Sequence, residues 1–448
     1  MKSAALLVAL ALLGVPTLAQ AQVAGPFTGS VVNGAVTADV QALSLADALS
    51  KGLQFNLGLV GVDQLVESAR GSRMRTLREL MPRVDARIGD VRQTSNLAAF
   101  GFDTSLFPGI GPVVGPYSIF DARVSASQTV FDLSALRELR SKDASMDAAR
   151  LDARNARDTV TFIVTSLYFQ AVAGESRITT VKSQVATAEA LLAQATSLRN
   201  AGVAPGVDVV RAQVQVQVQR QRLIAAENDF AKQCIQLQRA IGVPAGQRIS
   251  LTDSSLSLPA AALGVDDAVQ RALSTRPDYQ AMQDRVKAAE AMLAATRADA
   301  LPSLHVAGDY GTIGSNPGNA RRTYAMSAAI RVPLFDQDRQ GRLVENLAAL
   351  KQRQAEAADL AQRIEADVRT AALDVRAAEQ QVSVAHERAA LANQELSLSR
   401  IRFTAGVTSN LEVIQAQNEV TTAEEAELGA TYALNVARAA FTRAVGGQ

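Results

Sequence analysis

The sequence predicts a mixed fold of transmembrane β-strands and long coiled-coil helices, with each part made twice. Three observations lead to this fold class. An apolar run near the N-terminus ends in a secretory cleavage motif. The rest of the chain repeats itself at offsets of 220 and then 204 residues. Within each copy, the spacing of apolar residues changes from helical to alternating and back to helical.

Residues 1–21 are expected to be a secretory signal peptide. Lys2 precedes an apolar run from Ala4 to Val15, and Ala19-Gln20-Ala21 has the small-x-small pattern of a cleavage site. No cysteine follows the cut, so an N-terminal lipid anchor is not expected. No later window is long and apolar enough for a membrane-spanning helix. A mature chain that enters a membrane must therefore do so by strands.

Composition favours long helices. The 448 residues contain no Trp and few other aromatics, and the formal net charge is +1. A balanced charge gives no reason to expect a nucleic-acid partner. The single Cys234 excludes an internal disulfide, and a buried helical thiol is its expected state.

The two copies have the same order of parts. The first covers residues 22–242, the second covers 263–448, and a polar linker at 243–262 joins them. Residues 22–42 have no helical period and are expected to be extended or mobile. Each copy then opens with helical sequence that stops at a proline, Pro82 or Pro302, because proline cannot continue a helix.

Two strands follow in each copy, at about 83–92 and 118–130 in the first and at about 303–312 and 322–333 in the second. In the first strand Val84, Ala86 and Ile88 alternate with polar residues. Strands of about ten residues with one apolar and one polar face are typical of a membrane barrel. Half-buried strands of a soluble sheet give the same pattern, and the signal peptide and the number of strands favour the membrane.

The rest of each copy is a long helical hairpin, over 132–242 and 336–446. In the second hairpin, small and apolar residues step by four and three from Leu343 to Leu396, with Gln354 the one polar member of this series. Such a period predicts coiled-coil packing, and small side chains let helices approach closely. About sixty residues at 1.5 Å each give a rod of roughly 100 Å.

Each hairpin reverses through a related turn. Ala-Gly-Val at 201–203 recurs at 405–407, and an acid-Val-aliphatic-x-Ala-Gln run follows each. The turns contain Gly202 and Gly406, and their acids are Asp208 and Glu412.

With this order of parts, the chain resembles the TolC family of outer-membrane efflux and secretion channels. The most specific points are the two turns and the strand-to-helix junctions Val130-Phe131-Asp132 and Val332-Pro333-Leu334-Phe335-Asp336. The resemblance covers nearly the whole mature chain. It implies a homotrimer in which each chain gives four strands to a twelve-stranded β-barrel, continuous with an α-helical periplasmic tunnel. The residues agree with this, because four strands alone cannot close a barrel and open edges cannot face lipid.

The resemblance also implies a location and partners. The protein would lie in the outer membrane, in contact with its lipid, with a helical extension in the periplasm. A periplasmic adaptor protein and an inner-membrane transporter would work with it. The turns would form the periplasmic tip, where the tunnel closes and the adaptor docks.

By position, Glu412 and Asp208 match the acids that line the family's constriction. Gln415 stands where some members carry a second acid, so one acidic ring per trimer is expected. Three carboxylates converging on a pore favour cations. Acids in the first turn of a helix also complement its dipole, and both roles remain open. Arg402 and Arg211 are expected either to form ion pairs that hold the tip shut or to be surface charges.

The function implied is a passive exit duct of a tripartite efflux or type I secretion system. The alternative is an exported periplasmic coiled-coil scaffold that never enters the membrane. An enzyme is not expected: the two histidines, His305 and His386, have no partner at ligand spacing, and no nucleophile-base constellation or phosphate loop is present. No cofactor and no metal are therefore expected.

Overall fold

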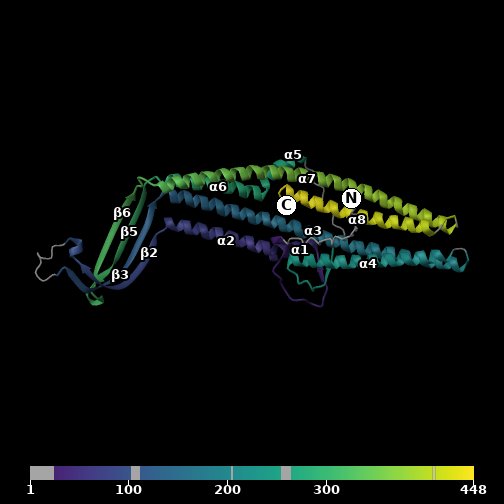
Figure 1. Ribbon diagram of the computed structural model, residues 1–448, viewed down its shortest axis with the longest axis horizontal. Coiled ribbons are helices and arrows are strands. Elements are labelled where there is room, and N and C mark those ends of the chain that lie inside the picture. Colours follow the sequence, from purple (N-terminus) through teal and green to yellow (C-terminus); the bar gives the residue numbers. More distant parts are fainter. Residues whose placement is uncertain are drawn as a thin grey trace, which may run out of the picture.

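The computed structural model describes residues 25–101, 111–202, 205–253, 264–405, 407–408 and 410–447. The expected signal peptide lies outside these residues. The molecule is elongated, with a four-stranded sheet at one end and the two helix turns at the other (Figure 1). Within the described ranges, no helix is both long and apolar enough to cross a membrane.

Two helices of 68 residues each, α3 (Leu133–Asn200) and α7 (Gln337–Thr404), run most of the length of the molecule. At 1.5 Å per residue each is about 100 Å long. Two shorter helices lie end to end along each long one (Figure 1): α2 (Leu57–Leu77) and α4 (Gly206–Ile241) along α3, and α6 (Pro277–Ala298) and α8 (Asn410–Ala444) along α7. Contacts of α3 with α6 and α8 join the two copies.

The strand-to-helix junctions are helix caps. The Asp132 carboxylate accepts a hydrogen bond from the Ala135 N–H at 3.1 Å, and Asp336 accepts one from the Arg339 N–H at 3.2 Å. Each satisfies a backbone donor that the first turn of a helix leaves unpaired. The repeated Phe-Asp pair therefore marks where each long helix begins.

The sheet has the order β2-β3-β5-β6, and all its neighbours are antiparallel. Its strands are β2 (Arg83–Asn96), β3 (Val113–Phe131), β5 (Ser303–Gly314) and β6 (Arg321–Arg331). All four predicted strands exist, but three extend further than predicted because backbone pairing continues where the side-chain alternation fades. The prediction for the fourth ran too far: β6 ends at Arg331, two residues before Pro333, which has no N–H for a ladder bond.

The two faces of the sheet differ. Ile88 and Met326 lie on the apolar face and are 78% and 83% exposed. On the other face, Arg123 lies 2.7 Å from Asp121 and 3.1 Å from Asp309 on the neighbouring strand. The sheet therefore presents large apolar side chains on one side and charged side chains on the other.

The opening helix of each copy is broken in two, which the sequence analysis did not predict. The first copy has α1 (Leu45–Phe55) before α2, and the second has α5 (Val265–Thr275) before α6. The breaks fall at Asn56 and Arg276, which are equivalent under the 220-residue offset. The buried Asn56 caps α2 by accepting from the Gly58 N–H at 2.9 Å, and Pro277 starts α6.

The segments expected to be extended or unstructured pair with each other. Strand β1 (Gln41–Leu43) lies parallel to β4 (Ile249–Leu251), which belongs to the predicted linker. Residues 249–251 of the linker therefore form a small sheet with the N-terminal segment. Short 3-10 turns lie at Pro26–Thr28, Arg78–Leu80, Ala98–Phe100 and Pro317–Asn319.

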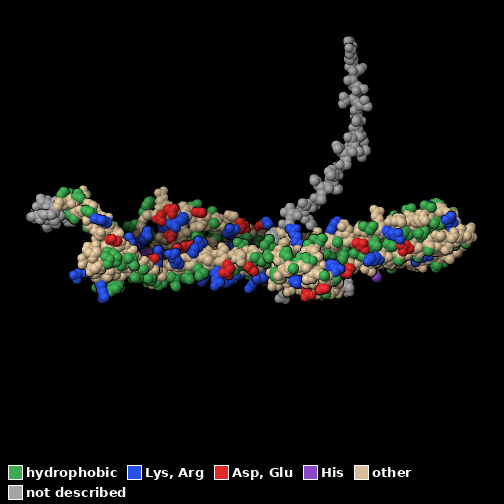
Figure 2. Space-filling view, turned by 90° about the horizontal axis from the view of Figure 1, so that it is seen from below, with side chains coloured by type: hydrophobic (Ala, Val, Ile, Leu, Met, Phe, Trp, Pro, Cys, Tyr) green, Lys and Arg blue, Asp and Glu red, His purple; other side chains and the backbone are tan. Residues whose placement is uncertain are grey.

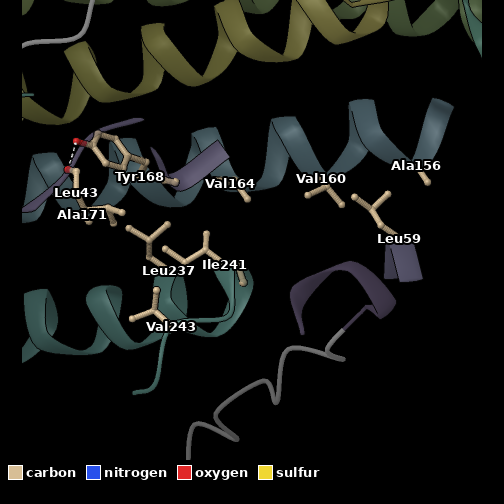
Figure 3. Close-up of a cluster of buried hydrophobic side chains, with 12 residues drawn as sticks. Leu43, Leu59, Ala156, Val160, Val164, Tyr168, Ala171, Leu237, Ile241 and Val243 are labelled. Atoms are coloured by element: carbon tan, nitrogen blue, oxygen red, sulfur yellow. Dashed lines mark hydrogen bonds between the residues drawn. The ribbon is translucent and has the colours of Figure 1, made fainter. Parts of the chain in front are cut away.

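A hydrophobic cluster midway along the molecule fixes this small sheet to the helices (Figure 3). Val160 and Val164 of α3 and Leu237 of α4 are completely buried in it, together with Leu43 of β1. The second copy builds a matching cluster from Ile364, Val368 and Phe441, the residues 204 positions later. The repeat in sequence is thus a repeat in packing.

The predicted apolar stripe of α7 is buried only in part. It is buried from Ile364 onward at most positions, through Ala371 and Ala385 to Leu396. Nearer the sheet it is not: Leu347 is 41% exposed. There α6 lies beside α7, whereas toward the tip α8 covers it.

Candidate functional site

Both hairpin turns lie at the end of the molecule farthest from the sheet (Figure 1). Gly202 ends the first long helix with φ +74°, a backbone conformation that strains other residues, and its N–H donates to the Arg199 carbonyl at 2.9 Å. Gly406 of the second turn lies outside the described residues. The two turns therefore form one tip, as the repeat implies.

At the first turn, Asp208 lies in the first turn of α4 and is 5% exposed. Its carboxylate is 3.4 Å from Nη1 of Arg211, one turn further along the same helix. A carboxylate at this position complements the positive end of the helix dipole. The structure brings these two predicted residues together on one helix.

At the second turn, Glu412 connects two helices. Its carboxylate lies 3.4 Å from Nη1 of Arg402 at the end of α7, and it accepts a hydrogen bond from the Thr408 hydroxyl in the turn itself. The Arg402 side chain is 57% exposed, so the pair is open to solvent. Gln415 is exposed on α8. Glu412 therefore contacts both the end of α7 and the turn, whereas the Gln415 amide lies at the surface.

Apolar packing holds the two turns in place. Phe403 of α7 and Val413 of α8 are buried beneath the second turn with Leu396. Val209 and Ala212 of α4 are buried beneath the first. The charged groups of the tip therefore lie next to buried apolar side chains.

Polar contacts between the two hairpins were not foreseen from the sequence. The Gln215 amide donates to Oδ1 of Asn418 at 2.7 Å, and the Gln184 amide donates to Oε2 of Glu424 at 3.0 Å. Both glutamines are buried. A signal was present, since Gln215 and the fully buried Gln219 are four residues apart and share one face of α4. Because glutamine is polar, a pattern of hydrophobic residues predicts that such positions face solvent.

The remaining reactive side chains are held in structural contacts. The His386 ring, on α7, lies 2.6 Å from Glu427 on α8, and the His305 ring contacts Thr129 and Ser303. Burial, with a contribution from Glu175, raises the pKa of the Cys234 thiol to about 11, so little of it is ionised at neutral pH. Among the described residues, no group of three His, Cys, Asp or Glu side chains could hold a metal ion.

Known proteins share this arrangement. Over 238 residues the chain is 26% identical to the pyoverdine export outer membrane protein OpmQ of Pseudomonas putida, a match that covers 52% of this chain and 50% of that protein. The chain thus spans about half the length of this curated relative. The outer membrane protein VceC of Vibrio cholerae has the same fold, with a TM-score of 0.77 at 15% identity over 90% of this chain and 96% of that one.

The open state of the Neisseria gonorrhoeae MtrE outer membrane channel is also similar, with a TM-score of 0.74 at 18% identity over 90% of this chain and 89% of that one. A family model described as outer membrane efflux protein matches residues 49–243 and 268–447, which include both strand pairs and both hairpins. That family consists of transport ducts rather than enzymes. The chain belongs to the outer membrane efflux protein family.

Proposed function

We propose that this protein is the passive outer-membrane exit duct of a tripartite efflux or type I secretion system. It carries substrates from an inner-membrane pump and a periplasmic adaptor to the exterior. The observation that supports this most strongly is the sheet, because its exposed apolar face needs lipid to cover it. A soluble protein rarely leaves so many large apolar side chains in water.

The sheet also supports a homotrimer. Among the strands that the structure describes, the outer ones, β2 and β6, each have one edge without a partner, and an open edge cannot be satisfied within lipid. Three chains would join β2 to β6 around a closed barrel of twelve strands. The same association would cover the sheet-proximal part of the α7 stripe, and the helices would enclose a tunnel in the periplasm.

The tip would close this tunnel and dock the adaptor. In a trimer, Glu412 would supply one ring of three carboxylates around the pore, with Arg402 beside it. Asp208 is buried in the first turn of α4, where its carboxylate complements the helix dipole. Because Gln415 carries no charge, one acidic ring rather than two lines the constriction. Gly202, Gly406 and Arg211 would shape and brace the turns.

A small-molecule cargo is the better supported one. OpmQ is named for export of pyoverdine, and the match to it is partial. The exposed apolar face of the sheet argues against the alternative of a periplasmic coiled-coil scaffold, which would have no use for it.

Membrane fractionation, native mass spectrometry and planar-bilayer recording test the duct. We expect the mature protein in the outer-membrane fraction, as a detergent-solubilised trimer that conducts ions. A monomer in the soluble periplasmic fraction, without conductance, would contradict the proposal and favour the scaffold. Copurification of an adaptor and a pump with the full-length protein would identify the partners.

A further inference from the structure

A cavity of about 410 Å³ lies where the sheet meets the helices. The end of α2 and strands β2, β3 and β5 line it. The register pairs Arg83 with Ser127 and Thr129 with His305, so these side chains share the polar face of the sheet, opposite the apolar one. The cavity therefore opens toward the interior of the proposed barrel.

Arginines dominate this end of the polar face. Arg75 and Arg78 of α2 and its following turn line the cavity with Arg83. Arg87 and Arg331 lie on the same face at the same end of the sheet. We name these five residues the arginine collar: Arg75, Arg78, Arg83, Arg87 and Arg331.

Most of the collar has no carboxylate partner. In the described part of the chain, Arg83 pairs with Asp85 at 2.8 Å, whereas the other four arginines have no ion pair. Glu79 is the one acid that lines the cavity. By contrast Arg73, on the same helix, is held by Asp143. The collar therefore has more positive than negative charge.

Toward the middle of the same face the charge is balanced, because Arg123 lies between Asp121 and Asp309. The acids at the junction itself are already engaged: Asp132 caps α3, and Asp299 lies 3.0 Å from Arg342. None of them is available to neutralise the collar.

Closing the barrel adds positive charge. In the proposed trimer, β2 of one chain lies beside β6 of the next. The sequence of β6, Arg-Arg-Thr-Tyr-Ala-Met-Ser-Ala-Ala-Ile-Arg, contains no Asp or Glu. It ends at the collar with Arg331. A neighbouring edge strand therefore cannot pair Arg87 of β2 with a carboxylate.

We propose that the arginine collar binds the carboxylate, phosphate or sulfate groups of solutes as they pass from the helical tunnel into the barrel. This inference rests on the proposed duct. Guanidinium groups bind such oxyanions through two parallel hydrogen bonds, and the hydroxyls of Ser127 and Thr129 lie within the same cavity to add donors. Lipid headgroups meet the opposite, apolar face, so a solute is the occupant.

Inorganic tripolyphosphate is a suitable probe, because it is a small polyanion that carries several phosphate groups. In planar bilayers of phosphatidylcholine we expect it to block the current of the full-length channel. The double variant Arg75→Gln/Arg78→Gln should weaken the block roughly tenfold in apparent Kd, the effect of losing about one charge-assisted hydrogen bond. Arg321→Gln is the matched control, since Arg321 lies on the same face at the far end of β6, and it should leave the block unchanged.

The other possible outcomes contradict either the collar or the proposed duct. If tripolyphosphate blocks the wild type and the double variant equally, and both migrate as trimers on gels, the collar does not bind the anion. A block that weakens when the bilayer contains phosphatidylglycerol shows that a lipid headgroup, not a solute, occupies the site. A protein that never conducts contradicts the proposed duct instead. Calorimetry with tripolyphosphate on the solubilised protein then still tests the collar, and the absence of binding there overturns it.

Discussion

The charged side chains of the tip differ in what they can control. Asp208 is buried and lies beside Arg211 on its own helix, whereas Glu412 connects the end of α7, the turn and the start of α8. A contact between elements changes when those elements move. We therefore propose that Glu412 influences opening of the tip.

Replacing Glu412 by Gln should weaken cation block at the tip. The change removes one carboxylate per chain from the proposed ring and its pairing with Arg402. Exposed pairs of this kind contribute about 0.2–1 kcal/mol, so a few-fold change in the blocking concentration of a trivalent cation is expected in planar bilayers. Glu419→Gln is the control, since Glu419 pairs with Arg388 between the same two helices, further from the tip. Indistinguishable block in both variants leaves Glu412 with only its role at the helix dipole.

At the scale of elements, Tyr168 of α3 joins three parts of the chain. Its hydroxyl lies 3.0 Å from the Leu43 carbonyl in β1 and 3.0 Å from the Asp253 carboxylate that follows β4 (Figure 3 shows the contact with Leu43). Asp253 also accepts from the Leu45 N–H at 2.8 Å. One buried hydroxyl thus ties the small parallel sheet to a long helix.

Tyr168→Phe should lower the free energy of unfolding by about 1–2 kcal/mol, because a buried hydrogen bond is lost while its acceptors keep other donors. Burial raises the pKa of this phenol from 10.0 to about 12. A raised pKa means that the stabilisation is complete below about pH 10 and is lost as pH rises through 12. Urea unfolding from pH 5 to 9 should therefore show a constant difference from wild type.

Tyr432→Phe is the matched control, since the Tyr432 hydroxyl has no hydrogen bond within the described residues. It should change the urea midpoint little. Equal losses in both variants would show that the Tyr168 hydroxyl does not hold the sheet. Faster limited proteolysis of the segment before Leu45 in Tyr168→Phe alone would locate the effect.

At the scale of the whole molecule, the helices and the apolar face of the sheet expose different side chains. Lys and Arg side chains are frequent over the sheet-proximal half of the helices on the face drawn in Figure 2. On the apolar face of the sheet, Ile88, Met326 and Ile330 are exposed, whereas the charged residues Asp90, Arg92 and Arg322 of that face lie farther from the helices. Exposed apolar side chains on one face of a strand, with polar ones on the other, are typical of a strand that meets lipid on one side and water on the other.

Met326→Arg should therefore destabilise the membrane-inserted protein far more than Ser327→Arg. Met326 lies mid-strand on the apolar face, and arginine near the middle of a bilayer costs about 2–4 kcal/mol per chain. Its neighbour Ser327 points to the opposite, polar face, where a charge meets water. Folding into lipid vesicles, followed by heat-modified gel migration, measures the difference. Equal yields of folded trimer would mean that the apolar face does not contact lipid.

The sequence by itself determined the features that rest on local pattern. Four strands, two very long helices and their duplication follow from periodicity, and the strand-to-helix junctions at Asp132 and Asp336 follow from a repeated residue pair. The sequence also placed Glu412 beside the second turn. Each of these depends on residues close together in the chain, where spacing alone carries the information.

Only the tertiary structure decided which distant groups meet. The pairing of β1 with β4 joins residues about two hundred positions apart, and neither segment's sequence indicates its partner. The same holds for Gln215 with Asn418, and for the arginines that converge from α2 and the sheet. A polar side chain has the same pattern in sequence whether it faces water, a partner or a pore. The fold alone assigns its surroundings, because those come from other elements.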